Sequence, residues 1–140
     1  MSVLGRFSLW VDHRVLIGTA TGSWCVETAR EFADEFKQIA GELIAQPWGH
    51  IIYLDDWGLG VPEIEPVIEE LTHWAIANNL CLAAQVFSPN MLKAYQMNKM
   101  VHDVHGHFER RQFANADQAF SWLHQHGFST GHSDFKRHGT

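Results

Sequence analysis

The sequence predicts an α/β fold with one domain, in which helices pack against a mixed, mainly parallel sheet. Segments that alternate apolar and polar residues give way to segments with apolar residues every three or four positions, in the order β-β-α-β-α-β-α-β-α. The chain has 140 residues, the size of one ordinary domain. Hydrophobic residues make up 46% and charged residues 19%, a composition typical of globular proteins.

Two strands open the chain. Residues 6–12 alternate apolar and polar side chains, and residues 15–20 are rich in β-branched side chains. Because only two residues separate these strands, we expect an antiparallel hairpin. The pattern breaks at residues 21–23, and we expect Ser23 to cap the helix that follows.

A helix, a strand and a second helix come next. Residues 26–43 place apolar side chains three and four positions apart, and the proline at position 47 predicts that this helix ends near residue 46. Residues 51–54 form a short unbroken apolar run, which fits a strand covered on both faces. The second helix should begin between Pro62 and Pro66, because proline is tolerated in a first helical turn.

The last third of the chain predicts two more strands and two more helices. Residues 80–87 are expected to form a strand, and Ser88-Pro89 is typical of the start of the third helix. Residues 107–113 predict a weaker fifth strand. Residues 115–118 resemble a capping box, which indicates a final short helix.

Charge and composition exclude several classes of protein. Ten Lys and Arg against sixteen Asp and Glu give a net charge of -6, which disfavours a nucleic-acid partner. No apolar run approaches the roughly 20 residues of a membrane helix, and the first residues do not resemble a secretory signal. Cys25 and Cys81 show no CxxC spacing, so we expect no disulfides and a cytoplasmic location. We expect residues 1–127 to form the domain and residues 128–140 a flexible tail.

The loop after the third predicted strand is the main candidate for a binding site. It lies at the carboxyl end of that strand, where open α/β sheets gather their ligands. Asp55 and Asp56 offer carboxylates to a cation or a partner, and Gly58 and Gly60 allow a close approach or a positive φ. Trp57 is expected to be partly exposed. The alternative is that the aspartates cap a turn while Trp57 covers the core.

A second candidate surface lies on the third predicted helix. Met91, Leu92 and Tyr95 point away from the face that carries Met97 and Met100. This apolar patch fits a protein contact or a homodimer interface. It also fits a surface that the C-terminal tail covers.

The ten histidines are many for this length, but the sequence predicts neither an enzyme nor a cofactor. His102, His105 and His107 could offer nitrogen ligands to a metal, although no HExxH motif or Cys/His quartet accompanies them. No GxSxG nucleophile motif occurs, and we expect Cys25 to be a buried, inert thiol. A metal-dependent hydrolase that uses the histidine-rich segment 102–107 is the alternative prediction.

The order of the elements and the end of the chain resemble a known superfamily. Residues 110–123 read RRQFANADQAFSWL, a strand that ends in Phe, then a short gap and a helix with Ala, Trp and Leu. Together with the opening hairpin and the small size, this segment is similar to the SpoIIAA-like branch of the STAS superfamily, which includes anti-sigma-factor antagonists. The resemblance extends over about residues 6–126. It implies a STAS-like fold and a regulatory role.

Signalling members of this family carry a phosphorylatable serine in an Asp-Ser-Ser-Gly-like turn before the second helix. The nearest match here is the segment 55–60, in which Asp56 and Trp57 stand where serines would be. The chain thus resembles a divergent member without the phosphorylatable serine. We therefore predict a non-catalytic regulatory or interaction module that binds a protein partner, or an apolar, lipid-like small molecule, near this loop.

Overall fold

One seven-stranded sheet organises the protein in the computed structural model, which describes residues 4–101 and 104–131. The strands are β1 (Arg6–Asp12), β2 (Val15–Trp24), β3 (Trp48–Tyr53), β4 (Trp57–Gly60), β5 (Leu80–Val86), β6 (Val104–His105) and β7 (Phe108–Phe113). The helices are α1 (Val26–Ala40), α2 (Ile64–Ala77), α3 (Met91–Met100) and α4 (Ala116–Gln125). Within these residues, no helix is both long enough and apolar enough to cross a membrane.

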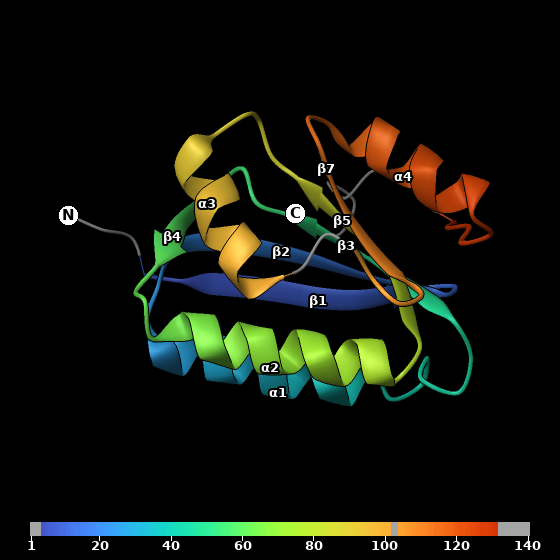
Figure 1. Ribbon diagram of the computed structural model, residues 1–140, viewed down its shortest axis with the longest axis horizontal. Coiled ribbons are helices and arrows are strands. Elements are labelled where there is room, and N and C mark those ends of the chain that lie inside the picture. The colour runs from blue at the N-terminus through green and yellow to red at the C-terminus, as the bar shows by residue number, and fades with distance from the viewer. Residues whose placement is uncertain (1–3, 102–103, 132–140) are drawn as a thin grey trace.

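The sheet is mixed and mainly parallel, as the sequence predicts. β1 and β2 form the expected antiparallel hairpin, and the short β6 is antiparallel to β7. Strands β2, β3, β5 and β7 lie in that order and run parallel to one another. Helices α1 and α2 lie side by side on one face of the sheet, and α4 covers the other face (Figure 1).

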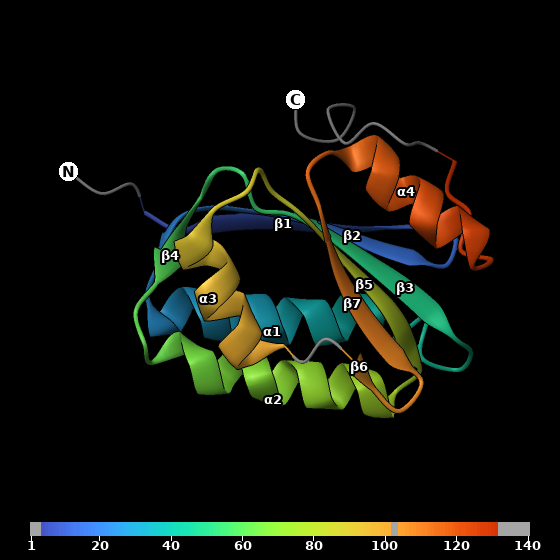
Figure 2. The same ribbon diagram turned by 45° about the horizontal axis from the view of Figure 1, so that its top comes forward.

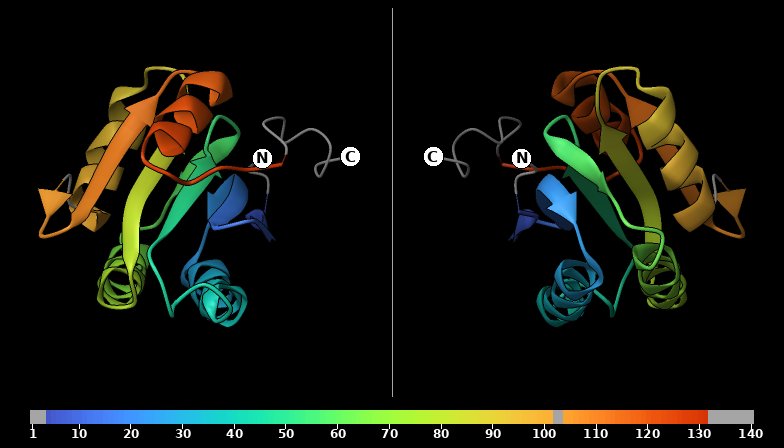
Figure 3. Two further views of the ribbon diagram at one scale, coloured as in Figure 1. Left: turned by 90° about the vertical axis from the view of Figure 1, so that its right-hand side faces the viewer. Right: turned by 90° about the vertical axis from the view of Figure 1, so that its left-hand side faces the viewer.

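Helix α3 lies next to β4, on the same side of the sheet as α2 (Figure 2). The two end views in Figure 3 place the α1 and α2 pair and α4 on opposite sides of the strands. This layering divides the apolar interior into two parts. The larger part is enclosed by α1, α2 and α3, and the smaller part lies under α4.

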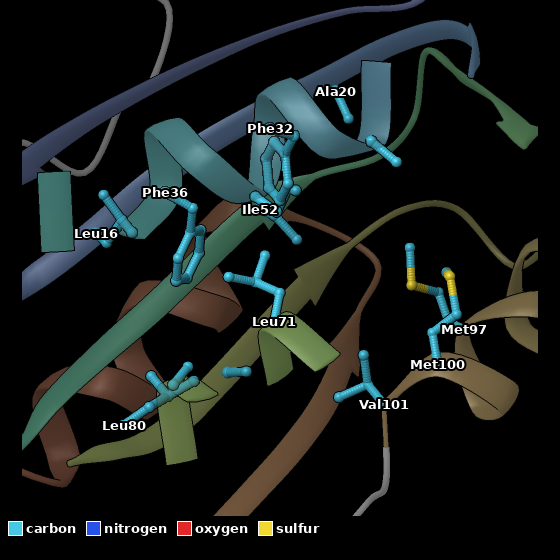
Figure 4. Packing of buried hydrophobic residues seen from close by; sticks show 14 of the residues in the cluster. Leu16, Ala20, Phe32, Phe36, Ile52, Leu71, Leu80, Met97, Met100 and Val101 are labelled. Atoms are coloured by element: carbon cyan, nitrogen blue, oxygen red, sulfur yellow. The ribbon is translucent and has the colours of Figure 1, made fainter. Parts of the chain in front are cut away.

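The central strand β3 contributes side chains to both parts of the interior. Trp48 and Ile52 join the larger core, whereas Ile51 and Tyr53 pack against α4. All six residues of β3 are buried, as expected for a parallel strand covered on both faces. Figure 4 shows the larger core, in which side chains from α1, β3, α2 and α3 face one another.

Strand β2 is longer than predicted because it has a partner that the sequence pattern does not reveal. The alternation breaks after residue 20, yet the strand continues to Trp24. Gly22 pairs with Trp57, and Trp24 pairs with Gly60, so β4 keeps this end of β2 extended. The predicted loop therefore contains a short strand.

Helix α1 is shorter than predicted and begins without a side-chain cap. Its N-cap is Cys25, which makes no capping hydrogen bond, rather than Ser23. The helix ends at Ala40 instead of near residue 46. In the turn that follows, the carbonyl oxygen of Leu43 accepts the guanidinium of Arg14 at 2.7 Å and the backbone N–H of Gln46 at 3.3 Å.

Helix α3 begins later than the Ser88-Pro89 signal predicts. Its N-cap is Asn90, whose side chain accepts the backbone N–H of Lys93 at 3.0 Å. The predicted cap of α4 is confirmed, because the side chain of Asn115 accepts the N–H of Gln118 at 3.0 Å.

The chain remains packed beyond residue 127, the predicted end of the domain. Phe128 is buried in the core under α4, and its N–H donates to the carbonyl of Leu123 at 2.9 Å. The N–H of Gly131 donates to the carboxylate of Asp12 at 2.8 Å. Residues 132–140, which belong to the predicted tail, lie outside the described residues.

Candidate functional site

The segment from Asp55 to Gly60 lies at the carboxyl end of β3, where the sequence places the candidate site. Asp55 and Asp56 are exposed in the turn between β3 and β4. Trp57 is expected to be partly exposed, but it is only 3% exposed. Its indole packs into the larger core. One carboxylate oxygen of Asp55 accepts the N–H of Ser88 at 2.8 Å and so joins this turn to the segment before α3. Whether the loop binds a partner stays a prediction.

Of the two purposes predicted for the glycines of this segment, a close approach is present and a positive φ is not. The residue with positive φ is Leu59, at 72°, rather than Gly58 or Gly60. Gly60 is required by a close approach, because a Cβ atom there would lie 2.1 Å from Cδ1 of Ile64. Ile64 is fully buried at the start of α2. Gly60 thus lets β4 lie directly against α2.

Two buried polar side chains of α3 hold this helix against the loop. The ammonium of Lys93 donates to the carbonyl oxygens of Leu54 at 2.7 Å and Asp55 at 2.8 Å. The side-chain amide of Gln96 accepts the N–H of Gly60 at 3.1 Å and donates to its carbonyl at 3.0 Å. The sequence analysis did not identify Lys93 or Gln96. Their three-residue spacing, which places them on one helix face, is the signal that was available.

A cavity of about 80 Å³ lies between the sheet and helices α1, α2 and α3. Leu54, Trp57 and Ile64 line the part of it that is next to the candidate loop. Most of the remaining wall is apolar and includes Phe32, Phe36, Ile52, Leu71, Met97 and Met100 (Figure 4). Protein interiors contain few voids larger than a water molecule, so this space is a distinctive feature of the core.

Among the described residues that line the cavity, none carries a charge at neutral pH. The polar side chains there are His50, Thr72 and Gln85, together with the indole N–H groups of Trp24 and Trp57, and the Trp57 N–H is buried without a hydrogen-bond partner in the described part of the chain. The hydroxyl of Thr72 donates to the carbonyl of Ile68, one turn earlier in α2, at 2.9 Å. Gln85 accepts from the guanidinium of Arg110 at 2.8 Å, and its amide nitrogen contacts the Met97 sulfur at 3.4 Å.

His50 is the titratable group of the cavity wall. Its Nδ1 lies 2.8 Å from the carbonyl oxygen of Leu16, and its ring meets that of Phe36 edge-on at 5.1 Å. Burial lowers the pKa of His50 to about 4, so the ring is neutral at pH 7. Because a carbonyl only accepts, the proton is on Nδ1, and Nε2 is left as a hydrogen-bond acceptor.

Comparisons with known proteins identify the architecture. No family model and no curated protein matches the sequence. Among solved structures, the chain is similar to an uncharacterised protein of the DUF3478 family with a SpoIIAA-like fold, from Shewanella loihica PV-4, with a TM-score of 0.67. The match covers 88% of this chain and 98% of that chain at 13% sequence identity. The protein has a SpoIIAA-like fold.

At 13% identity the likeness concerns the SpoIIAA-like fold alone. In that fold, the segment 55–60 precedes α2, which is where the sequence analysis places the family's phosphorylated turn. Asp56 is exposed there, whereas Trp57 is buried. The segment contains no serine.

The apolar patch that the sequence predicts on α3 is solvent-exposed in this protein. Met91 is 89% exposed, Leu92 66% and Tyr95 64%. The ammonium of Lys99 lies 4.5 Å from the centre of the Tyr95 ring, so a cation borders the patch. These residues lie on the opposite side of α3 from Met97, which lines the cavity. A role as a protein contact or homodimer interface stays a prediction.

The predicted histidine cluster falls largely outside the described part of the chain. His102 and the side chain of His105 are not described, and His107 is exposed in the turn between β6 and β7. Within residues 4–101 and 104–131, no three His, Cys, Asp or Glu side chains gather to hold a metal ion. Cys25 is exposed rather than buried, because its neighbour Trp24 takes the inward position.

Proposed function

We propose that this SpoIIAA-like protein is a non-catalytic regulatory module that binds an apolar small molecule in the cavity beneath the Asp55–Gly60 loop and α3. The cavity is the observation that supports this proposal most strongly. Residual empty space destabilises a core by about 24 cal/mol per Å³, so 80 Å³ costs about 2 kcal/mol. A ligand that fills the space would recover this free energy.

The volume limits the size of the ligand. An apolar cavity of about 150 Å³ in another protein binds benzene, and this one has about 80 Å³. The ligand is therefore a few carbons of a chain, or a small ring that displaces side chains. Met97 and Met100 form part of the wall, and unbranched methionine side chains adapt more easily than branched ones.

The contacts of α3 connect the cavity to the surface. Met97 and Met100 face the cavity, while Lys93 and Gln96 of the same helix bind the loop. A ligand that moves the methionines shifts α3, and with it the loop that presents Asp55. Occupancy of the interior is thus expected to alter the surface that a partner meets, which is the basis of the regulatory part of the proposal.

Toluene is a suitable probe, because it is small, apolar and uncharged. We expect it to raise the melting temperature of the wild type, since a ligand that binds the native state stabilises it by mass action. Ala83→Leu adds three carbons to the cavity wall and should abolish the effect. Ala77→Leu, at an exposed position of α2, is the matched control and should respond like the wild type. An absent response in the wild type, or an equal one in Ala83→Leu, would contradict the proposal.

A protein partner is the second candidate occupant, favoured by the exposure of Met91, Leu92 and Tyr95. Large apolar side chains this exposed are typical of interaction surfaces. Light scattering tests for a homodimer, and affinity purification compares the wild type with a variant that carries serine at all three positions. Loss of a specific partner in that variant would support this role, and identical partners would contradict it.

A further inference from the structure

One hydrogen-bond acceptor in the cavity wall is unused. Thr72 and Gln85 each have protein partners, whereas the indole N–H of Trp57, a donor, has none among the described residues. His50 uses Nδ1 to donate to the Leu16 carbonyl, and no described residue hydrogen-bonds to its Nε2. The residue is only 8% exposed, and its ring lines the cavity. A molecule in the cavity that carries a donor would hydrogen-bond to this nitrogen and gain affinity from that contact.

We propose that the cavity binds an uncharged apolar molecule carrying one hydroxyl or N–H group, which donates a hydrogen bond to Nε2 of His50. This inference rests on the proposed function and adds the chemical class of the ligand. His50 would then favour a ligand that carries a hydrogen-bond donor over a ligand of the same size that has no donor.

The position of His50 fixes the orientation of such a molecule. His50 lies in β3 between Leu16 of β2 and Ala83 of β5, in the middle of the sheet. Leu54, which borders the candidate loop, is four residues further along the chain, about 13 Å in an extended strand. The donor group would therefore lie deep in the core, with the apolar part extending toward Trp57.

The absence of charge in the described cavity wall excludes an ionic head group. A carboxylate or phosphate buried here would need a cation, and the described lining residues supply none. Burial keeps the His50 ring neutral at pH 7, so it does not supply one either.

Phenol and toluene form a matched pair of probes, because a hydroxyl in one replaces a methyl group in the other. Dissociation constants can be measured by NMR titration of the methionine methyl groups, with benzoate as a charged comparison. In His50→Asn, the amide can still donate to Leu16, but the ring acceptor is lost. We expect this variant to lower the ratio of phenol to toluene affinity about 3-fold to 10-fold relative to the wild type. Thr72→Val is the control and should leave the ratio unchanged.

A comparison of two ligands of the wild-type protein tests the same hydrogen bond and does not depend on whether a variant folds. Anisole keeps the phenolic oxygen but has no hydrogen to donate, so phenol should bind more tightly than anisole. Equal affinities, an unchanged ratio in His50→Asn, or binding of benzoate as tight as that of phenol would overturn the inference while leaving the proposed function intact. If none of the probes binds, the proposed function fails, and the inference fails with it.

Discussion

Protonation of His50 should make the stability of this protein depend on pH in a predictable way. The folded state lowers the pKa of His50 from 6.5 to about 4, because the charged ring would be buried. Between these values the unfolded chain binds a proton that the native chain does not. The contribution of neutral His50 to the free energy of unfolding is therefore fully present above about pH 6.5, and it is lost as the pH falls toward 4.

The size of this change in stability follows from the shift in the pKa of His50. The difference of 6.5 − 4, about 2.5 pH units, at about 1.36 kcal/mol per unit gives about 3 kcal/mol, most of it lost by pH 4.5. Domains of this kind are stable by about 5–15 kcal/mol, so the effect is a large fraction of the total. Urea unfolding followed by tryptophan fluorescence at pH 7.5 and pH 4.5 measures it. Carboxylates also contribute to the loss of stability at low pH. One of them is Glu27, whose pKa is lowered by a backbone hydrogen bond.

Variants separate the contribution of His50 from these others. His50→Asn cannot be protonated in this range, so it should lose about 2–3 kcal/mol less than the wild type between the two pH values. His107→Asn removes an exposed histidine and should behave like the wild type. If wild type and His50→Asn lose the same free energy, His50 is not buried as a neutral ring, and the reasoning is refuted.

Three further predictions concern the loop and α3. Gly60→Ala should destabilise the protein by about 1–3 kcal/mol in urea unfolding, because its Cβ would collide with Ile64; a smaller loss than in Gly58→Ala would contradict this. Gln96→Leu should cost about 1–3 kcal/mol and speed hydrogen exchange at the Gly60 amide, and an unchanged exchange rate would refute the contact. Leu92→Ser should change stability by no more than about 0.5 kcal/mol, and a larger loss would show that the patch is covered.

Much of the fold could be predicted because hydrophobic periodicity reports directly on burial. The hairpin, the central strand and the helices all follow this rule. Strand β4 could not be predicted, since it has four residues, two of them glycine, and its partner is the distant Gly22. Its formation depends on tertiary contacts rather than on a local pattern.

The candidate site was only partly predictable. The carboxyl end of β3 indicated the right region, and the buried position of Trp57 matches the alternative interpretation, in which this side chain covers the core. In the sequence, Lys93 and Gln96 resemble ordinary solvent-facing helix residues. The fold places them against backbone groups of residues 54–60, to which they hydrogen-bond. His50 precedes the apolar run that marked the strand, so the pattern left it out. A cavity depends on how well side chains fill space in three dimensions, which no periodicity records.

The pairing of Gln96 with Gly60 also bears on solubility. A strand end with free N–H and C=O groups is a template for intermolecular β-pairing, which leads to aggregation. Here the side-chain amide of Gln96 hydrogen-bonds to both the N–H and the C=O of Gly60, as a neighbouring strand would. Unlike a strand, it presents no free backbone edge to which another chain could pair. One side chain thereby blocks sheet extension at this point.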